Sequence, residues 1–468
     1  MAADRDYDAV IVGAGVSGSF IANALTQAGM RCVLLEAGRS FDRHEYPDND
    51  LDGNALLYWG GGIEFNRDAS IGLVRPKAVG GGSIVNQALV DRFDDSAFES
   101  WQEASGVSFL NRTEMDPWYD AAASNLSIQT VPEEYANGNG RIFRDGFANN
   151  GYKCAPLERA QADCRFEDGN CCIECLRGCP IESKQSTPVT VLRKARAAGL
   201  EIISRFEALH IETEERGAVT VSGRASDGGT RSFRGRRLVL GAGAIGNSRL
   251  LLLSGLDKKL PALGRNFYTH PQFMTLALYD EPVNAQRGPL QSYKSADPAF
   301  RANGFKLENV FTGPVGIAIL LPSFGAEHMR RMRDITRMAC IEVAVRDTNP
   351  GRITVNSSGR AIVDKTLNDE DRRRRALGLE AIDNIFRSTG AREIIASDLA
   401  IGLHLMGGCN IGVDAVASVV SPEFRLHGFD NIHVADSSIF PNAPGINPSF
   451  TIMALSCKAA AQILEDAR

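Results

Sequence analysis

The first forty residues constrain the fold of this chain more than any other stretch, because they combine a strand, a glycine turn and a helix. In "YDAVIVGAGVSGSFIANALTQAGMRCVLLEAG" a short apolar run at 10–12 precedes a G-x-G-x-x-G turn formed by Gly13, Gly15 and Gly18. Such glycines permit a tight turn, close approach of the backbone to a pyrophosphate, and close packing of helix on strand. We predict a buried strand at 10–12 and a helix from about 17 to 28, whose N-terminal N–H groups face the anion.

An acidic residue completes this pattern. Glu36 ends a second predicted strand 18 residues beyond Gly18, where a carboxylate accepts hydrogen bonds from a ribose. A lone glycine motif predicts only a tight turn, but the strand, helix and acid together predict a dinucleotide site. Its residues are Gly13, Gly15, Val16, Ser17, Gly18 and Glu36.

A similar pattern, "LVLGAGAIG", occurs at 238–246 and raises the alternative of a second nucleotide site. A ribose-binding acid is expected about 20 residues past such a turn, but the chain has "LGRNFYTHP" there. The helix pattern "RLLLLSG" instead predicts packing on the sheet near the first nucleotide. One dinucleotide without a nicotinamide partner favours FAD.

The length, charge and composition of the chain exclude some classes of protein. A chain of 468 residues predicts two or three domains, and the formal charge of −6 argues against a nucleic-acid partner. No apolar run approaches the ~20 residues that span a bilayer, and acids in "MAADRDYDAV" argue against a secretory signal. Five scattered cysteines are typical of buried thiols in a reducing compartment. We therefore expect a soluble, cytoplasmic protein.

With these segments in place, the chain resembles the glucose–methanol–choline (GMC) oxidoreductase family of flavoenzymes. The resemblance runs nearly end to end, through the N-terminal fingerprint, "VGGGSIVNQAL", "LVLGAGAIGNSRLLLLSG", "HLMGGCNIG" and "HVADSSIFPNAPGINPSFTIMA". "HLMGGC" is closer to the cholesterol-oxidase and bacterial sugar-dehydrogenase branch. The resemblance implies an α/β fold in which 1–100, 185–265 and 398–468 form a discontinuous, Rossmann-like FAD domain with a doubly wound sheet. The ranges 101–184 and 266–397 would form a substrate domain of antiparallel sheet flanked by helices, with cap segments.

The resemblance also implies further cofactor contacts. The segment 80–86, including Gly81, Ser83 and Asn86, would lie along the flavin. Ala208 would contact adenine through its main chain, and Asp436 would reach the phosphate–ribityl part. Pro448 and Ser449 begin a helix whose positive end would face the flavin. "RPKAVGGGSIVNQ" lacks the histidine or cysteine that carries flavin in covalent relatives, so FAD is expected to be non-covalent.

Flavin-dependent oxidation of an alcohol requires a base for the hydroxyl proton, and histidine is the usual choice. The family's pair is a histidine followed some forty residues later by histidine or asparagine, and His404 and Asn447 match these positions. Asn447 before Pro448 also predicts a helix N-cap. The alternative for His404 is a buried core histidine without a catalytic role. We expect His270 in "YTHP" to be structural.

The run "NCCIECLRGCP" at 170–180 holds four of the ten cysteines, where some relatives carry clustered cysteines. Cys172, Cys175 and Cys179 resemble part of a ferredoxin-type spacing and are candidate iron–sulfur ligands, with Cys164 or Cys171 as a fourth. Zinc, a disulfide and plain buried thiols are alternatives. The absence of a metal is slightly favoured.

The sequence thus predicts an FAD-dependent enzyme that oxidises a CH–OH group of a polar alcohol such as a sugar, glycoside or aminoglycoside-like compound. A lipophilic alcohol such as a sterol is the first alternative. A lyase on the same fold and a non-catalytic electron-relay flavoprotein are the others. Oxygen, a small acceptor and a redox protein all stay open as electron acceptors.

Overall fold

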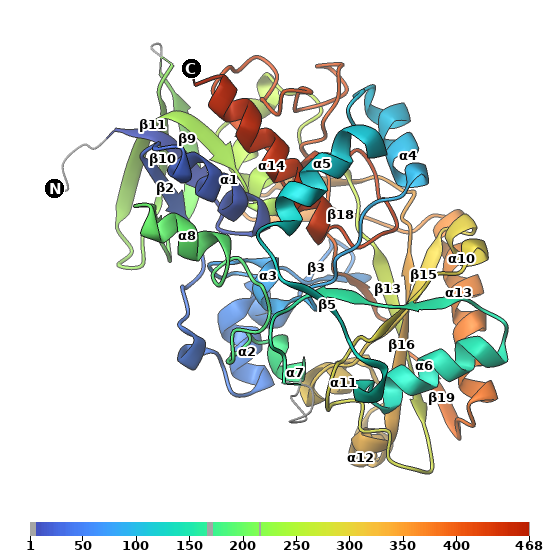
Figure 1. Ribbon diagram of the computed structural model, residues 1–468. Helices are drawn as coiled ribbons and strands as arrows, with labels where there is room; N and C mark the ends of the chain where they lie inside the picture. The colour runs from blue at the N-terminus through green and yellow to red at the C-terminus, as the bar shows by residue number, and fades with distance from the viewer. Residues whose placement is uncertain (1–5, 166–171, 215–216, 468) are drawn as a thin grey trace.

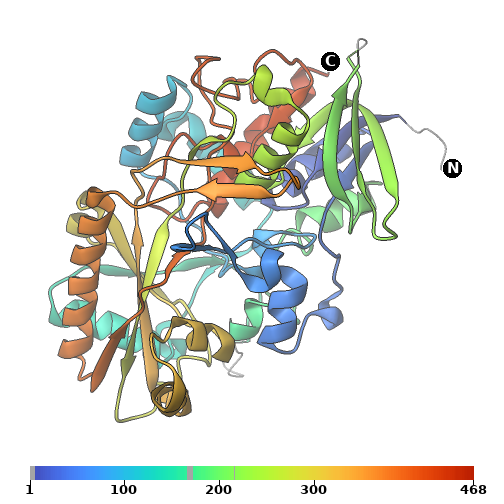
Figure 2. The ribbon, with the colours of Figure 1, turned by 180° about the vertical axis from the view of Figure 1, so that it is seen from behind.

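The computed structural model describes residues 6–165, 172–214 and 217–467, apart from the side chain of Cys172. Two sheets organise these residues, one at the upper left and one at the lower right of Figure 1. Figure 2 shows the same two halves from behind.

The first sheet carries the predicted nucleotide turn. Its strands are β1 (Tyr7–Val12), β2 (Cys32–Leu35), β8 (Glu201–Ile203), β9 (Glu207–Thr213), β10 (Val219–Arg224), β11 (Thr230–Leu240) and β21 (Ile432–Val434). The strands β8, β2, β1, β11 and β21 are parallel neighbours in that order. The first half of β11 also pairs antiparallel with β10, and β10 pairs antiparallel with β9. The helix α1 (Val16–Gln27) packs beside α14 (Ser449–Glu465) over this sheet, as Figure 1 shows. The predicted strand–turn–helix–strand order is confirmed.

The second sheet is largely antiparallel. Its strands are β3 (Glu64–Phe65), β4 (Ile71–Leu73), β6 (Cys154–Pro156), β13 (Pro271–Leu278), β14 (Tyr293–Ser295), β15 (Phe305–Asn309), β16 (Met338–Val345), β19 (Glu393–Ala396) and β20 (Ala400–Gly402). Every residue of β13 and β16 is buried. The long helix α13 (Asp369–Ser388) packs on β16 and against α6 (Gly138–Asn149). The predicted α/β class, with a Rossmann-like half and an antiparallel half flanked by helices, is confirmed.

Some segments join the halves. The strands β3, β4 and β20 pair in the second sheet, although the predicted FAD domain includes 1–100 and 398–468. The domain boundaries themselves stay a prediction. The chain therefore crosses between the halves several times, and a site between them draws on distant parts of the sequence.

The remaining elements connect or cover these sheets. The helices are α2 (Asp50–Leu57), α3 (Gly82–Val85), α4 (Asp95–Ser105), α5 (Arg112–Ala123), α7 (Cys172–Cys175), α8 (Val191–Ala197), α9 (Gly243–Leu253), α10 (Pro298–Ala302), α11 (Pro314–Leu320) and α12 (Gly325–Arg333). Two small sheets contain β5 (Ile128–Thr130), β7 (Glu158–Ala160), β12 (Arg265–Phe267), β17 (Gly351–Val355) and β18 (Ala361–Asp364).

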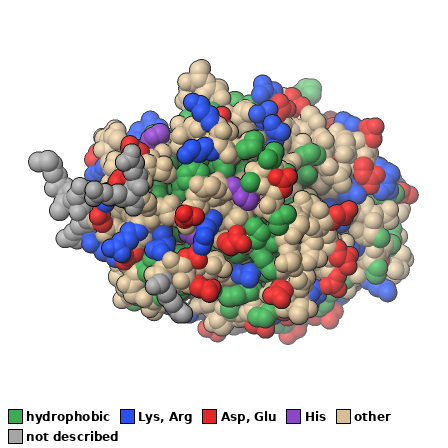
Figure 3. All heavy atoms as spheres, turned by 90° about the horizontal axis from the view of Figure 1, so that it is seen from above, with side chains coloured by type: hydrophobic (Ala, Val, Ile, Leu, Met, Phe, Trp, Pro, Cys, Tyr) green, Lys and Arg blue, Asp and Glu red, His purple; other side chains and the backbone are tan. Residues whose placement is uncertain are grey.

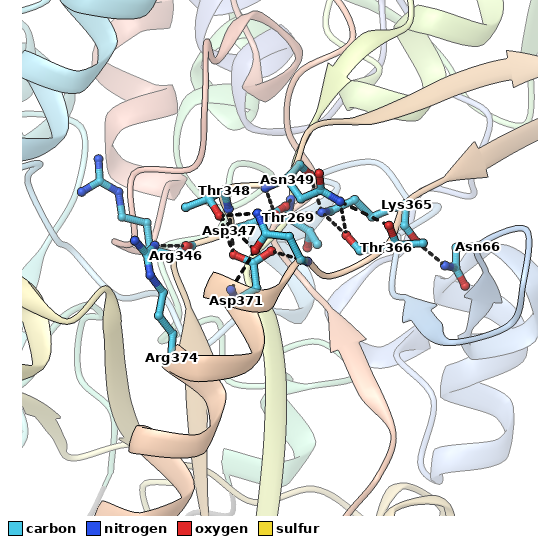
Figure 4. A network of polar contacts seen from close by, with 11 residues as sticks. Asn66, Thr269, Arg346, Asp347, Thr348, Asn349, Lys365, Thr366, Asp371 and Arg374 are labelled. Carbon is cyan, nitrogen blue, oxygen red and sulfur yellow. Dashed lines mark hydrogen bonds and ion pairs between the residues drawn. The ribbon is translucent and has the colours of Figure 1, made fainter.

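A buried ion pair fixes the start of β13 (Figure 4). The Lys365 ammonium lies 2.8 Å from the Asp347 carboxylate, and both side chains are fully buried. Lys365 also donates to the carbonyl oxygens of Asn349 and Thr366, at 2.5 and 2.8 Å. The other Asp347 oxygen accepts the N–H of Thr269 at 3.1 Å. Because His270 follows Thr269, this network helps to hold the histidine in place.

Charges of both signs are mixed on the face of the molecule seen from above (Figure 3). Figure 3 shows acidic and basic side chains interspersed over the face seen from above. Most arginines of α13 pair with acids of their own helix, for example Arg373 with Glu370 at 2.8 Å, whereas Arg375 pairs with Asp398 beyond it. In the part of the chain described, none of the helices combines the length and apolar character needed to cross a membrane.

Candidate active site

A cavity of about 1280 Å³ lies between the two sheets and is lined by residues of both. Sites for one small molecule usually measure about 300–1000 Å³. The larger volume leaves room for a dinucleotide and a second molecule beside it.

Three glycine turns bound the nucleotide end of this cavity. Gly13 has a φ of +96°, and a Cβ there would overlap the Gly241 carbonyl oxygen. A Cβ on Gly81 would lie 2.7 Å from the Cα of Gly15. Gly18 lies behind the turn, where a side chain would overlap the Gly13 carbonyl and separate α1 from β1. Gly241 belongs to "LVLGAGAIG", so this second glycine pattern borders the same cavity as the N-terminal glycine turn.

The acidic side chains at this end brace the turns. Glu36 lines the cavity and accepts the N–H groups of Ala14 and Gly38 at 2.9 and 2.7 Å. Burial raises the pKa of Glu36, and those two hydrogen bonds oppose the shift. Asp436 accepts the N–H of Gly243 at 2.6 Å and thereby fixes the turn before α9. Its predicted contact with the phosphate–ribityl part stays a prediction.

Most of the other predicted cofactor residues also reach the cavity. Its lining includes Gly13, Gly15, Val16, Ser17, Gly81, Asn86, Ala208, Pro448 and Ser449. In the segment 80–86, Ser83 was also predicted to contact the cofactor, but it does not line the cavity. Its hydroxyl donates to the Gly80 carbonyl at 2.6 Å and contacts Thr187 at 3.3 Å. It supports the turn from behind.

The residues at this end fit FAD. The hydroxyl oxygens of Ser17 and Ser449 are buried and have no hydrogen-bond partner among the described residues, although both residues line the cavity. Buried polar atoms without partners are rare in folded proteins. Phosphate and flavin oxygens would satisfy them, and the glycine turns leave the backbone open to such a group.

The two predicted catalytic side chains belong to the other end of the cavity. His404 and Asn447 both line the cavity. Nδ1 of His404 lies 2.9 Å from Nδ1 of His270, and Nε2 of His270 accepts the Gly445 N–H at 2.9 Å. His270, expected to be structural, is thus a direct neighbour of His404.

These contacts assign the hydrogens of the two histidines. A neutral imidazole has one N–H and one acceptor nitrogen. Because Nε2 of His270 accepts from Gly445, its hydrogen is on Nδ1 and is donated to Nδ1 of His404. His404 therefore carries its own hydrogen on Nε2. Burial, followed by the charge of Lys306, lowers the pKa of His404 to about 3, so the ring is neutral.

Asn447 differs from its predicted role as a helix cap. The N-cap of α14 is Pro448, with no side-chain cap bond among the described residues. The Asn447 amide oxygen instead accepts from the Lys306 ammonium, and its nitrogen donates to Glu308 at 3.2 Å. The local Asn-Pro pattern is outweighed by this charged pair on β15.

Several polar residues of this end were not predicted. Glu308, Glu342, Gln272 and Gln291 are buried and line the cavity. Glu308 and Glu342 are paired across β15 and β16. Burial raises the pKa of Glu342 well above its usual range, and the neighbouring Glu308 charge adds to the shift. A signal was available, since Glu342 interrupts the apolar run "ACIEVAVR".

The cysteine run borders the cavity but is only partly described. Cys171 and the side chain of Cys172 lie outside the described residues. Cys175 and Cys179 are buried, and a hydrogen bond from Cys175, reinforced by the backbone N–H and charge of Lys184, lowers the pKa of Cys179 to about 6. Within the described residues, no group of three or more metal-ligating side chains occurs. Nothing here therefore supports the iron–sulfur hypothesis for Cys172, Cys175 and Cys179.

Lys184, five residues beyond Cys179, connects the cysteine run to a neighbouring segment of the chain. Its ammonium is buried and donates to the carbonyl oxygens of Ile84, Asn86 and Cys175, the last two at 3.0 and 2.5 Å. The cysteine run is thereby tied to the segment predicted to lie along the flavin.

Comparison with known proteins decides the family. Two family models, each described as GMC oxidoreductase, match residues 7–272 and 347–456. The chain belongs to the GMC oxidoreductase family. An uncharacterized GMC-type oxidoreductase of Mycobacterium tuberculosis is 30% identical, over 97% of this chain and 75% of the relative.

Other relatives differ in the substrates that their names give. Long-chain-alcohol oxidase FAO4B of Arabidopsis thaliana is 26% identical over 98% of this chain and 67% of its own. The fructose dehydrogenase large subunit of Gluconobacter japonicus is 23% identical over 98% of both chains. The solved structure of pyridoxine 4-oxidase from Mesorbium loti has a TM-score of 0.75 at 20% identity, and the match covers 98% of this chain and 99% of that one.

This GMC oxidoreductase is an FAD-dependent enzyme that acts on alcohols. The family and enzyme class predicted from the motifs are confirmed.

Proposed function

We propose that this GMC oxidoreductase oxidises the CH–OH group of a polar, polyhydroxylated alcohol. The observation that carries the proposal is the set of buried polar side chains beside His404 and Asn447: Gln272, Gln291, Glu308 and Glu342. The Gln272 amide oxygen has no hydrogen-bond partner among the described residues, which is costly for a buried polar group. Hydroxyl groups of a substrate can both donate to and accept from such a polar set.

The residues of the nucleotide end would hold FAD non-covalently, through Gly13, Gly15, Ser17, Glu36 and Gly81. When bound, FAD supplies the hydride acceptor of the reaction. No histidine or cysteine occurs in "RPKAVGGGSIVNQ" to carry a covalent link.

His404 is the proposed acceptor of the hydroxyl proton, and Asn447 the second group on the carbinol oxygen. The hydrogen bonds described above assign a hydrogen to Nε2 of His404, so this nitrogen can accept a proton only after both rings have changed tautomer, with the hydrogens then on Nδ1 of His404 and Nε2 of His270. His404 would then donate from Nδ1 to His270, and His270 could no longer accept from Gly445. The proposed reactive state therefore opens the contact between His270 and Gly445.

A lipophilic alcohol is a second candidate, favoured by the rim of the cavity. Phe65, Ile319 and Leu403 line the cavity and have 49%, 52% and 38% of their surface exposed. An apolar chain could lie along these side chains while its hydroxyl group reaches His404.

Anaerobic reduction of the bound flavin tests the proposal. Purified, FAD-loaded protein is mixed with sugars and other polyols, and separately with long-chain alcohols and sterols in detergent. Bleaching at 450 nm by polyols supports the proposal, and bleaching by the lipophilic set alone replaces it with the second candidate. Bleaching by neither leaves a lyase or an electron-relay protein.

The same preparation tests the cofactor predictions. Acid precipitation is expected to release all of the flavin into the supernatant, and yellow colour in the pellet would show a covalent link. Iron well below one atom per chain after anaerobic purification, with pure flavin bands, would remove the iron–sulfur hypothesis. A redox protein would then lose its main support as electron acceptor.

A further inference from the structure

We propose that Lys306, Glu308 and His270 preset His404 and Asn447 as two N–H donors, which form a binding site for one anionic oxygen such as a carboxylate oxygen. This inference rests on the proposed function for the identity of the catalytic pair, and it names a class of ligand for that pair. Lys306 and Glu308 act as positioning residues for Asn447, and His270 as the positioning residue for His404.

The Asn447 amide can adopt only one of its two orientations. An ammonium only donates hydrogen bonds and an ionised carboxylate only accepts them. The Lys306 ammonium contacts the amide oxygen, and Glu308 accepts from the amide nitrogen at 3.2 Å. The flipped amide would place its NH₂ group against the ammonium and its oxygen against the carboxylate. The Asn447 amide nitrogen keeps a second N–H for a ligand, since Asn447 lines the cavity.

The charged pair that sets this orientation is buried and is held by further hydrogen bonds. Lys306 and Glu308 lie two residues apart on one face of β15, with 2.6 Å between ammonium and carboxylate. Their side chains are 15% and 2% exposed. The second Glu308 oxygen accepts from Gln291 at 3.1 Å. Lys306 is not among the residues that line the cavity, so it acts through Asn447 and not on the ligand.

His404 contributes the second donor. The chain of hydrogen bonds from Gly445 through His270 leaves its hydrogen on Nε2. Gly445 has a φ of +73°, a conformation that favours glycine, and its N–H comes from the same loop that precedes Asn447. This loop therefore carries Asn447 and also holds His270 through the Gly445 N–H.

Two N–H donors held toward one oxygen favour an oxygen that carries negative charge. A carboxylate supplies such an oxygen without having to lose a proton, whereas an alcohol must first give one up. The resting site is therefore expected to bind small carboxylates in competition with the substrate, without any reaction.

Acetate is the probe. FAD-loaded protein is titrated with acetate at constant ionic strength, and the dissociation constant is read from the perturbation of the flavin visible spectrum. Lys306→Met should raise that constant about 10-fold or more, because the released Asn447 amide no longer holds its N–H toward acetate and one hydrogen bond to a charged oxygen is lost. Lys306→Arg keeps a cationic donor and should restore most of the affinity.

Lys294→Met is the matched control. Lys294 lies opposite Glu308 on the neighbouring β14 and pairs with the buried carboxylate of Asp91, but it does not line the cavity. Acetate affinity should stay at the wild-type value in this variant. FAD content and thermal unfolding are measured for all variants.

Wild-type protein gives an independent reading if Lys306→Met does not fold. ¹⁵N NMR of histidine-labelled protein should show His404 protonated on Nε2 and His270 on Nδ1. A hydrogen on Nδ1 of His404, an absence of acetate binding, or equal affinity in wild type and Lys306→Met would each overturn the inference. If acetate behaves as expected but no alcohol bleaches the flavin, the proposed function fails while the two-donor site stands.

Discussion

The two ends of the cavity are lined by different kinds of groups, the main chain at one end and side chains at the other. The nucleotide end consists of glycine turns, where Gly13 lies too close to Gly241, and Gly81 too close to Gly15, for a side chain to fit. The substrate end consists of charged and polar side chains on β13, β15 and β16, such as Glu308 and Glu342, which are almost fully buried.

This difference teaches which changes each end tolerates. A backbone site is sensitive to added atoms and to φ angles, because its contacts are main-chain groups. A site of buried charges is sensitive to removal of one partner, because the other charge is then left uncompensated. The variants below attack each property in turn.

The largest effect is expected from Gly13→Ala. The new Cβ would overlap Gly241 at a φ of +96°, so the turn must move and the purified protein should contain little FAD. Gly29→Ala is the control, since φ is +86° there but nothing lies within 4 Å of the added atom. It should cost only about 1 kcal/mol in stability and keep its FAD. Full FAD content in Gly13→Ala would contradict the backbone description.

Lys365→Met should lower the free energy of unfolding by about 3–5 kcal/mol, the usual cost of leaving a buried carboxylate unpaired. Chemical denaturation of the FAD-loaded protein measures it. The exposed pair of Arg387 and Asp383 provides the contrast, and Arg387→Ala should leave the melting temperature nearly unchanged. Equal effects of the two substitutions would show that burial of the pair does not matter.

His404→Ala should keep FAD bound and slow its reduction by the substrate about 10²-fold or more, the range for a lost acid–base group. Stopped-flow absorbance at 450 nm under anaerobic conditions measures the rate. A rate near that of wild type would remove His404 from the proposed chemistry.

The smallest effect concerns pH. The pKa of His404 is lowered to about 3 by burial and the Lys306 charge, so the ring is neutral throughout the range from pH 5 to 8. The rate of flavin reduction should therefore show no ionisation of His404 near pH 6.5. An inflection near that pH in wild type that disappears in His404→Ala would show that the ring titrates normally.

The nucleotide end could be predicted from the sequence because its physics is local. Gly13, Gly15, Gly18 and Glu36 belong to one strand–turn–helix–strand unit, and turn geometry and helix dipoles act over neighbouring residues. The five motifs in order extended this to the family, and the motif pair led to His404 and Asn447. The glutamates on β15 and β16 carry no such local pattern.

The sequence by itself determined the dinucleotide turn, the α/β class and the two residues of the proposed catalytic pair. Only the tertiary structure decided how that pair is held. Lys306 contacts Asn447 across 141 positions and His270 contacts His404 across 134, and such contacts depend on which strands pair and which faces meet. A hydrogen bond fixes an amide orientation or a tautomer only when its partner is within about 3 Å, a proximity created by folding and not by spacing along the chain.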